Sequence, residues 1–432
     1  MKTRFFWLFI LLCGYFYACK EGERYGLDVA SSGTPDAPNV LGTLPMEGGV
    51  RFYYTIPQND DILAVKAEYV NEFDETLMFS ASYFTDSLDV IGFADTVFYD
   101  VKIYAVNRAG KRSQEKTYKV KPLQSVVSLV AKSIEVKIGF GEFFVQWKND
   151  LEWSVNVHVH FKFKQQGLER DLLQVFTSSE SFFRGYVLDL NEVDNDELEI
   201  QVRVEDVYGN STPRMSFGKM RLKQDIKIPK KNVDGTMKWT MPYPNDSIGG
   251  IPQLWGNFGE GHNDKLIDDI INIGRNNNFI HTNYAGRTGT RSDGNGWNVL
   301  INLGDIYELS RCLTHQRHEG GDEYRTNKGF LYGAYNVGIY NMYILDESVR
   351  PPQWVFIHQH KIPIPTNVPD LEVCRLGIAG DMAYFYPDDP QFTPPTRWFR
   401  YEMINGFGAN YTAFDNVFSL SEITLFGRKT QK

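Results

Sequence analysis

The sequence predicts an all-β protein with two tandem β-sandwiches followed by a third, longer sandwich domain. Three observations lead to this prediction. Aromatic residues make up 14% of the 432 residues, and aromatic side chains suit pleated strands. Short segments alternate between apolar and polar residues and are separated by turn residues. One strand-and-turn pattern also occurs twice, about a hundred residues apart, and is not found again in the last part of the chain.

Residues 1–18 have the pattern of an export signal. A basic start precedes an apolar run over 5–12, and Ala18 is the small residue that a peptidase needs before its cut. The run is too short to span a bilayer as a permanent helix. Cleavage would leave Cys19 first, and the segment 19–23 resembles the sorting tag of Bacteroidetes lipoproteins that face the cell exterior. We therefore expect a lipid anchor on Cys19 in the outer membrane; a plain secretory signal with an incidental cysteine is the alternative.

Composition excludes several classes of function. The net charge is −9, and no basic block stands out, so nucleic acid is not an expected partner. Only Cys312 and Cys374 remain after the signal and the acylated residue, which excludes a disulfide-dense scaffold. They are either two buried thiols or one bridge. No nucleophile elbow, zinc-protease helix, phosphate loop or dinucleotide fingerprint occurs, so we expect no enzyme.

The repeat defines the first two sandwiches. After a polar tether over 19–36, Val101–Ser113 matches Ile200–Thr212 at an offset of 99 residues. In both copies an alternating strand ends in a polar turn that a glycine closes, because glycine readily adopts the positive φ of such turns. These matches predict one module over 37–122 and another over 123–226.

The strands of the two modules resemble those of fibronectin type III modules. The first copy carries Ala37-Pro38 at its entry, Tyr54 on a core strand and Tyr99 ahead of the repeated strand. The second keeps Trp147 but has Leu198 where the tyrosine would fall. The resemblance implies two sandwiches of about a hundred residues each. Nothing in either module points to chemistry.

A lysine-rich stretch over 227–234 is predicted to be a second linker, and a different domain follows over 237–432. Three segments carry its likeness in order: 266–269, 296–304 and 419–427. They resemble the discoidin family, also called coagulation factor five/eight type C, which is galactose-binding-like. The resemblance implies a β-sandwich of jelly-roll type. The whole arrangement is similar to surface lipoproteins of Bacteroidetes glycan-uptake systems.

The resemblance also implies a sugar site. Sugar-binding modules of the discoidin superfamily use a histidine on an early loop, an arginine after a later strand and an aromatic residue on a late loop. The matching residues here are His281 with Tyr284, Arg317, and Tyr411 with Phe414. An aromatic face packs on the apolar side of a galactose-type ring, while imidazole and guanidinium donors fix its hydroxyls. In the alternative, His281 caps a turn, Arg317 pairs with a nearby acid and Phe414 lies in the core.

A structural calcium site is a further expectation from the same resemblance. Asp268, Asn272 and Glu422 match positions that hold calcium in some relatives, but Ile270 stands where an oxygen donor is expected. Calcium takes six to eight oxygen ligands, so the loss of one weakens such a site. No other cofactor is expected.

These observations together predict a non-catalytic cell-surface lipoprotein that binds glycans through the loops of its C-terminal domain. It would act in a polysaccharide-utilisation system, alongside other outer-membrane proteins of glycan uptake. The alternative from another class is a protein-binding adhesin, or an assembly subunit of an outer-membrane complex.

Overall fold

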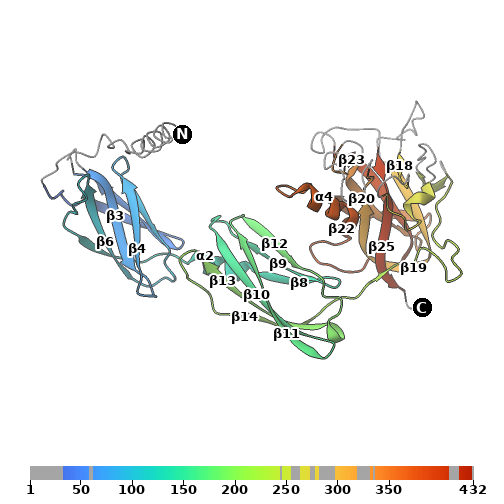
Figure 1. Cartoon of the computed structure of the whole chain (residues 1–432), viewed down its shortest axis with the longest axis horizontal. Coiled ribbons are helices and arrows are strands. Elements are labelled where there is room, and N and C mark those ends of the chain that lie inside the picture. The colour runs from blue at the N-terminus through green and yellow to red at the C-terminus, as the bar shows by residue number, and fades with distance from the viewer. Residues whose placement is uncertain are drawn as a thin grey trace, which may run out of the picture.

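A computed structural model describes most of the chain. The described residues are 33–57, 62–243, 246–253, 263–272, 278–281, 297–318, 331–333, 336–407 and 418–430. Their strands form two small sandwiches and a larger β-domain that follow one another along the long axis of the molecule (Figure 1). This confirms the predicted all-β class. Cys19 lies outside the described residues, and within them no helix is both long and apolar enough to cross a membrane.

The first module is a sandwich of two antiparallel sheets. Three strands form one sheet, in the order β1 (Asn39–Met46), β2 (Gly49–Thr55) and β5 (Ser87–Ile91). Four form the other, in the order β4 (Thr76–Ser82), β3 (Ile62–Val70), β6 (Tyr99–Asn107) and β7 (Lys116–Val120). Alternate residues of the facing strands, Phe52, Tyr54, Val65 and Ile103 among them, are fully buried between the sheets.

The second module repeats this arrangement after a short helix. One sheet has three strands, in the order β12 (Phe182–Val187), β9 (Phe143–Lys148) and β8 (Glu135–Ile138). The other has four, in the order β11 (Leu168–Ser178), β10 (Val155–Gln165), β13 (Glu197–Asp206) and β14 (Met215–Arg221). A 3₁₀ turn, η1, covers Asp194–Asp196. The helix α2 (Val126–Ser133) was not expected, because its buried Val126, Val127 and Val130 are β-branched residues that suit a strand equally well.

The two copies of the repeat share hydrogen bonds as well as residues. In the first turn the hydroxyl of Ser113 accepts from the backbone N–H of Ala105 at 2.9 Å. In the second, the hydroxyl of Thr212 accepts from the N–H of Val204 at 3.1 Å. A glycine closes each turn, with φ of 77° and 84°. The sequence repeat is therefore a structural repeat of a fibronectin-like strand and turn.

The C-terminal domain is built around one long, shared strand. Its main sheet runs in the order β15 (Ile226–Lys227), β25 (Glu422–Lys429), β19 (Trp297–His315), β23 (Thr396–Gly406), β20 (Val337–Asp346) and β21 (Gln353–Lys361), with β22 (Asp381–Tyr384) also paired to β19. The first part of β19 pairs with β23 and its second part with β25, so this strand connects the two halves of the sheet. Shorter elements are β16 (Ser247–Ile248), β17 (Ile251–Pro252), η2 (Asn263–Leu266), β18 (Ile280–His281), β24 (Ser419–Leu420) and α4 (Asp370–Ala379).

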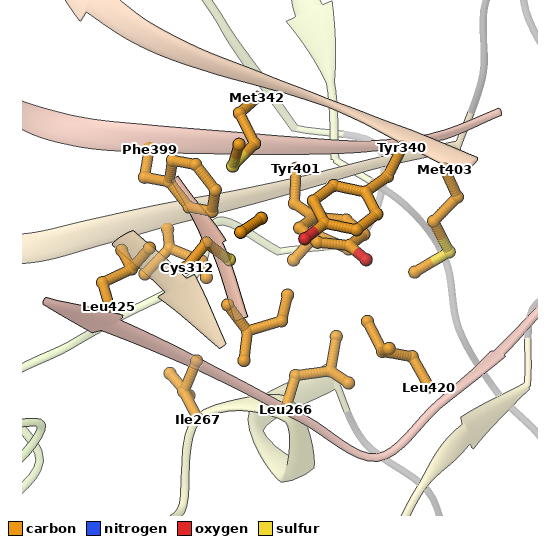
Figure 2. Packing of buried hydrophobic residues seen from close by; sticks show 14 of the residues in the cluster. Leu266, Ile267, Cys312, Tyr340, Met342, Phe399, Tyr401, Met403, Leu420 and Leu425 are labelled. Carbon is orange, nitrogen blue, oxygen red and sulfur yellow. The ribbon is translucent and has the colours of Figure 1, made fainter. Parts of the chain in front are cut away.

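The core of this domain is formed by buried side chains of the main sheet and of η2. Figure 2 shows the rings of Tyr340 and Tyr401 side by side above Leu266 and Leu420, and their centroids are 4.2 Å apart. Cys312 lies in the same cluster, and both it and Cys374 are buried free thiols. Burial raises the pKa of the Cys312 thiol to about 12, so it remains protonated and unreactive.

The stretch expected to be a linker belongs instead to the C-terminal domain. Ile226 and Lys227 form β15 on the edge of its sheet, and the N–H of Ile228 donates to the carbonyl of Leu425 at 2.9 Å. Ile228, Lys230 and Trp239 are all buried. The alternation Ile226-Lys227-Ile228 ends at Pro229 and is too short to predict a strand, so the sequence alone could not reveal this docking.

Both junctions between domains carry specific contacts. Between the two modules, the side-chain amide of Asn210 donates to the carbonyl of Gly92 at 2.9 Å. Asn210 belongs to the repeated turn, so the second copy of that turn holds the two modules together. Between the second module and the C-terminal domain, Arg311 forms two hydrogen bonds to the carboxylate of Asp225, at 2.9 and 2.7 Å. Both junctions are therefore fixed by hydrogen bonds.

Candidate functional site

One end of the C-terminal domain gathers segments that are distant in sequence. His281 on β18 pairs with Ser419 on β24, and Ser419 forms a parallel bridge with Asn336, the residue immediately before β20. At about 4.8 Å between neighbouring strands, the backbones of His281 and Asn336 are about 10 Å apart. Asn336 in turn accepts from the N–H of Arg317 at 3.2 Å and donates to its carbonyl at 2.9 Å. The structure thus brings the regions of His281 and Arg317 to the same end.

A phenylalanine packs against Arg317. The guanidinium carbon of Arg317 is 3.9 Å from the ring centroid of Phe279, which is a close cation–π contact. Phe279 comes two residues before His281, immediately ahead of β18. His281 is 8% exposed and Phe279 9% exposed, whereas Arg317 is half-buried. We call this end of the C-terminal domain the loop end, and the three residues Phe279, His281 and Arg317 its floor.

The other predicted sugar contacts, Tyr284, Tyr411 and Phe414, lie outside the described residues. Two residues that sequence reasoning missed, Asn336 and Ser419, are 1% exposed and hold the floor in place. The amide of Asn336 also donates to the carbonyl of Leu331 at 3.1 Å. A single asparagine outside any motif gives no sequence signal for such a role.

Two more histidines near this end have structural roles. The ring of His315 hydrogen-bonds to the backbone of Ile378, and that of His318 to the backbone of Gly377. These backbone groups belong to the last turn of α4, whose carbonyls lack partners within the helix. Burial lowers the pKa of His315 to about 4 and also lowers the pKa of His318. Both are therefore neutral near pH 7 and anchor the end of α4.

The residues expected to bind calcium have protein partners instead. The ammonium of Lys230 contacts the Glu422 carboxylate, and both side chains are almost completely buried. Asp268 accepts from the N–H of Ile270 at 2.9 Å, and Asn272 accepts from the N–H of His318 at 2.7 Å.

Lys230 therefore supplies the positive charge that this region needs. Its ammonium also lies 3.4 Å from the carboxylate of Asp269. Burial lowers the pKa of Lys230 to about 8, and Asp269 partly offsets that effect. In the described part of the chain no group of three or more histidine, cysteine or acidic side chains is arranged to hold a metal. The geometry does not support calcium at Asp268, Asn272 and Glu422.

A hollow of about 450 Å³ lies on the second module. Across its four-stranded sheet, Asp171, Lys162, Glu199 and Lys219 stand opposite one another, with alternating charge. The first pair forms an ion pair at 3.2 Å. Opposite charges on neighbouring strands stabilise a sheet, so this surface is explained by cross-strand pairing and we assign it no ligand.

Comparison with known proteins adds the following. Residues 35–122, the first module, match a family described as a domain of unknown function, DUF4959. No match is found among curated proteins. Among solved structures, a SusE-like protein is 14% identical, with 71% of this chain and 100% of that chain covered and a TM-score of 0.35. A two-domain fibronectin type III segment of chicken tenascin is 15% identical, with 43% and 99% covered and a TM-score of 0.20.

The chicken interferon gamma receptor alpha chain is 10% identical, with 42% of this chain and 97% of that chain covered and a TM-score of 0.19. The domain that matches a family thus coincides with the first fibronectin-like sandwich. The strand order and the repeated turns, rather than these distant likenesses, identify the two sandwiches.

Proposed function

We propose that this protein is a non-catalytic, lipid-anchored cell-surface protein that binds a glycan at the loop end of its C-terminal domain. The observation that carries the proposal is the floor, where the guanidinium of Arg317 packs on the ring of Phe279 and strand pairing brings His281 to the same end of the domain. Loops on a rigid sandwich are a common place for binding residues. The lipid anchor rests on Cys19 and the signal before it.

The chemistry of the floor suits a sugar. Imidazole and guanidinium groups donate to hydroxyls, and both are held by neighbours rather than free to rotate in solvent. Asn336 hydrogen-bonds to both the N–H and the carbonyl of Arg317, so the backbone of Arg317 is already ordered. The protein therefore loses less conformational entropy when a ligand binds. The resemblance assigns the stacking role to Tyr284, Tyr411 or Phe414, and such a residue together with these donors would combine stacking and hydrogen bonding, as galactose-type rings require.

A glycan array, followed by calorimetric titration, tests the proposal. The chain from Lys20 onward is screened, and the best ligand is titrated against wild type, His281→Ala and Arg317→Ala. Each substitution should weaken binding by about 1–3 kcal/mol, because a desolvated hydroxyl loses its partner. The double variant should lose less than the sum, as expected for two groups on one ligand. Unchanged affinity in both single variants would place the site elsewhere.

A protein-binding role has one observation in its favour. The edge strand β11 exposes Leu168, Leu172, Leu173 and Val175, and one of its sides pairs with no strand of the described chain. Exposed apolar edge strands pair readily with other chains. If this role were correct, Leu172→Lys with Leu173→Lys would abolish partner capture in a surface cross-linking experiment and leave glycan titration unchanged.

A further inference from the structure

One end of the first module carries three exposed apolar side chains. Leu63 is 52% exposed, Tyr83 37% and Phe84 92%. The rings of Tyr83 and Phe84 meet edge to face, with centroids 5.7 Å apart. The N–H of Tyr83 donates to the carbonyl of Leu63 at 3.2 Å, so the three residues are neighbours. We call Leu63, Tyr83 and Phe84 the apolar cap.

The chain leaves the module toward its N-terminus from this same end. Strand register places Asn107, the last residue of β6, opposite Ile62, which immediately precedes Leu63. The side-chain amide of Asn107 donates to the carbonyl of Gly33 at 3.1 Å. Residue 33, where the described chain begins, is therefore held at the end that bears the apolar cap.

The length of chain before Gly33 limits how far this end can be from a membrane. Cys19 and Gly33 are 14 residues apart. A chain spans at most about 3.6 Å per residue, so they are no more than about 50 Å apart in any conformation. With a lipid on Cys19, the module is therefore tethered at the end that bears the apolar cap, which can reach the bilayer.

We propose that the apolar cap inserts into the headgroup region of the bilayer to which the protein is anchored. The inference rests on the proposed lipid anchor. Aromatic side chains are favoured at membrane–water interfaces, and three side chains present too small a surface for a stable protein interface. The nearby exposed charges, Arg108, Lys111 and Asp86, are of both signs. Burial of the rings, rather than net charge, therefore drives insertion, and added salt should change it little.

An environment-sensitive label on the apolar cap tests this. The chain from Lys20 has only Cys312 and Cys374, both buried, so a nitrobenzoxadiazole label reacts only with an introduced thiol. A histidine tag before residue 20 tethers the chain to phosphatidylcholine–phosphatidylethanolamine vesicles that contain a nickel-chelating lipid. The label goes on Phe84→Cys and, as the matched control, on Phe98→Cys. Phe98 is 64% exposed and precedes β6, at the opposite end of the module.

Tethering should shift the emission of the label at position 84 to the blue and leave the label at position 98 unchanged. Without the tether, Phe84→Ser should lower the vesicle partition coefficient about tenfold, and Phe98→Ser should not. No shift at position 84, or equal shifts at both positions, would overturn the proposal. The tether here is artificial, so the result does not depend on acylation. Palmitate-analogue labelling of wild type and Cys19→Ala in cells tests the anchor separately.

Discussion

At the scale of single residues, the most informative side chain is Lys230, which no motif singled out. It is fully buried, and its ammonium contacts Glu422 and lies near Asp269. The resemblance to the discoidin family implied that Glu422 binds calcium, whereas the structure places the ammonium of Lys230 against it. A lysine between a proline and a second lysine looks like part of a solvated linker, so its burial depends on tertiary packing that sequence cannot show.

We expect Lys230→Met to destabilise the C-terminal domain by about 3–5 kcal/mol, because Glu422 would remain buried without a partner. Adding Glu422→Gln should recover a large part of that loss, since the uncompensated charge is then removed. Urea unfolding at neutral pH measures both. Lys162→Met, which breaks an exposed ion pair with Asp171, is the matched control and should cost less than about 1 kcal/mol. An equal loss of unfolding free energy for Lys230→Met and Lys162→Met would show that the buried ion pair contributes no more to stability than the exposed one.

At the scale of elements, the sequence predicted what depends on local pattern and missed what depends on packing. The repeated strand and turn could be read down to Ser113 and Thr212, because alternation, glycine and hydroxyl positions all recur. The helices α2 and α4 are short, and their apolar spacing does not distinguish helix from strand. At the loop end, His281 and Arg317 could be named from resemblance. Asn336 and Ser419 could not, because only strand pairing places them.

The anchoring of α4 predicts a pH dependence. The folded protein holds the pKa of His315 at about 4, below its ordinary value of 6.5, because burial disfavours the charged form and Lys230, Lys227 and His318 add to the effect. The unfolded chain therefore binds a proton first as the pH falls. The contribution of His315 to stability should be constant above pH 6.5 and should fall by about 3 kcal/mol between pH 6.5 and 4.

Thermal unfolding at a series of pH values measures this loss. His315→Asn keeps a donor for the carbonyl of Ile378 but cannot titrate, so its profile should be flatter over the same range. A wild-type profile that is already flat between pH 6.5 and 4 would contradict the structural role given to His315.

At the scale of the whole molecule, the second module and the C-terminal domain follow one another along the chain (Figure 1), and polar and aromatic side chains join them. Asp225 is nearly buried and is held by Arg311, whose guanidinium also faces the ring of Phe140 from the second module. Phe140 in turn packs edge to face on Phe392, with centroids 4.9 Å apart. Arg184 adds a further bond to Asp388 at 2.7 Å. These contacts fix the direction in which the loop end is presented.

The same joint changes what limited proteolysis should show. A linker over 227–234 would be cut early, but Lys227 is in β15 and Lys230 is buried, so trypsin should spare this region in the wild type. Asp225→Ala leaves Arg311 without its carboxylate and should weaken the joint by about 2–3 kcal/mol. Trypsin should then cut after Lys223 or Lys227 and release the C-terminal domain. Asp171→Ala, which removes an exposed partner of Lys162 in the same module, should leave the digestion pattern unchanged. Early cleavage of the wild type between residues 223 and 230 would mean that the joint is open in solution and that the loop end swings freely on the second module.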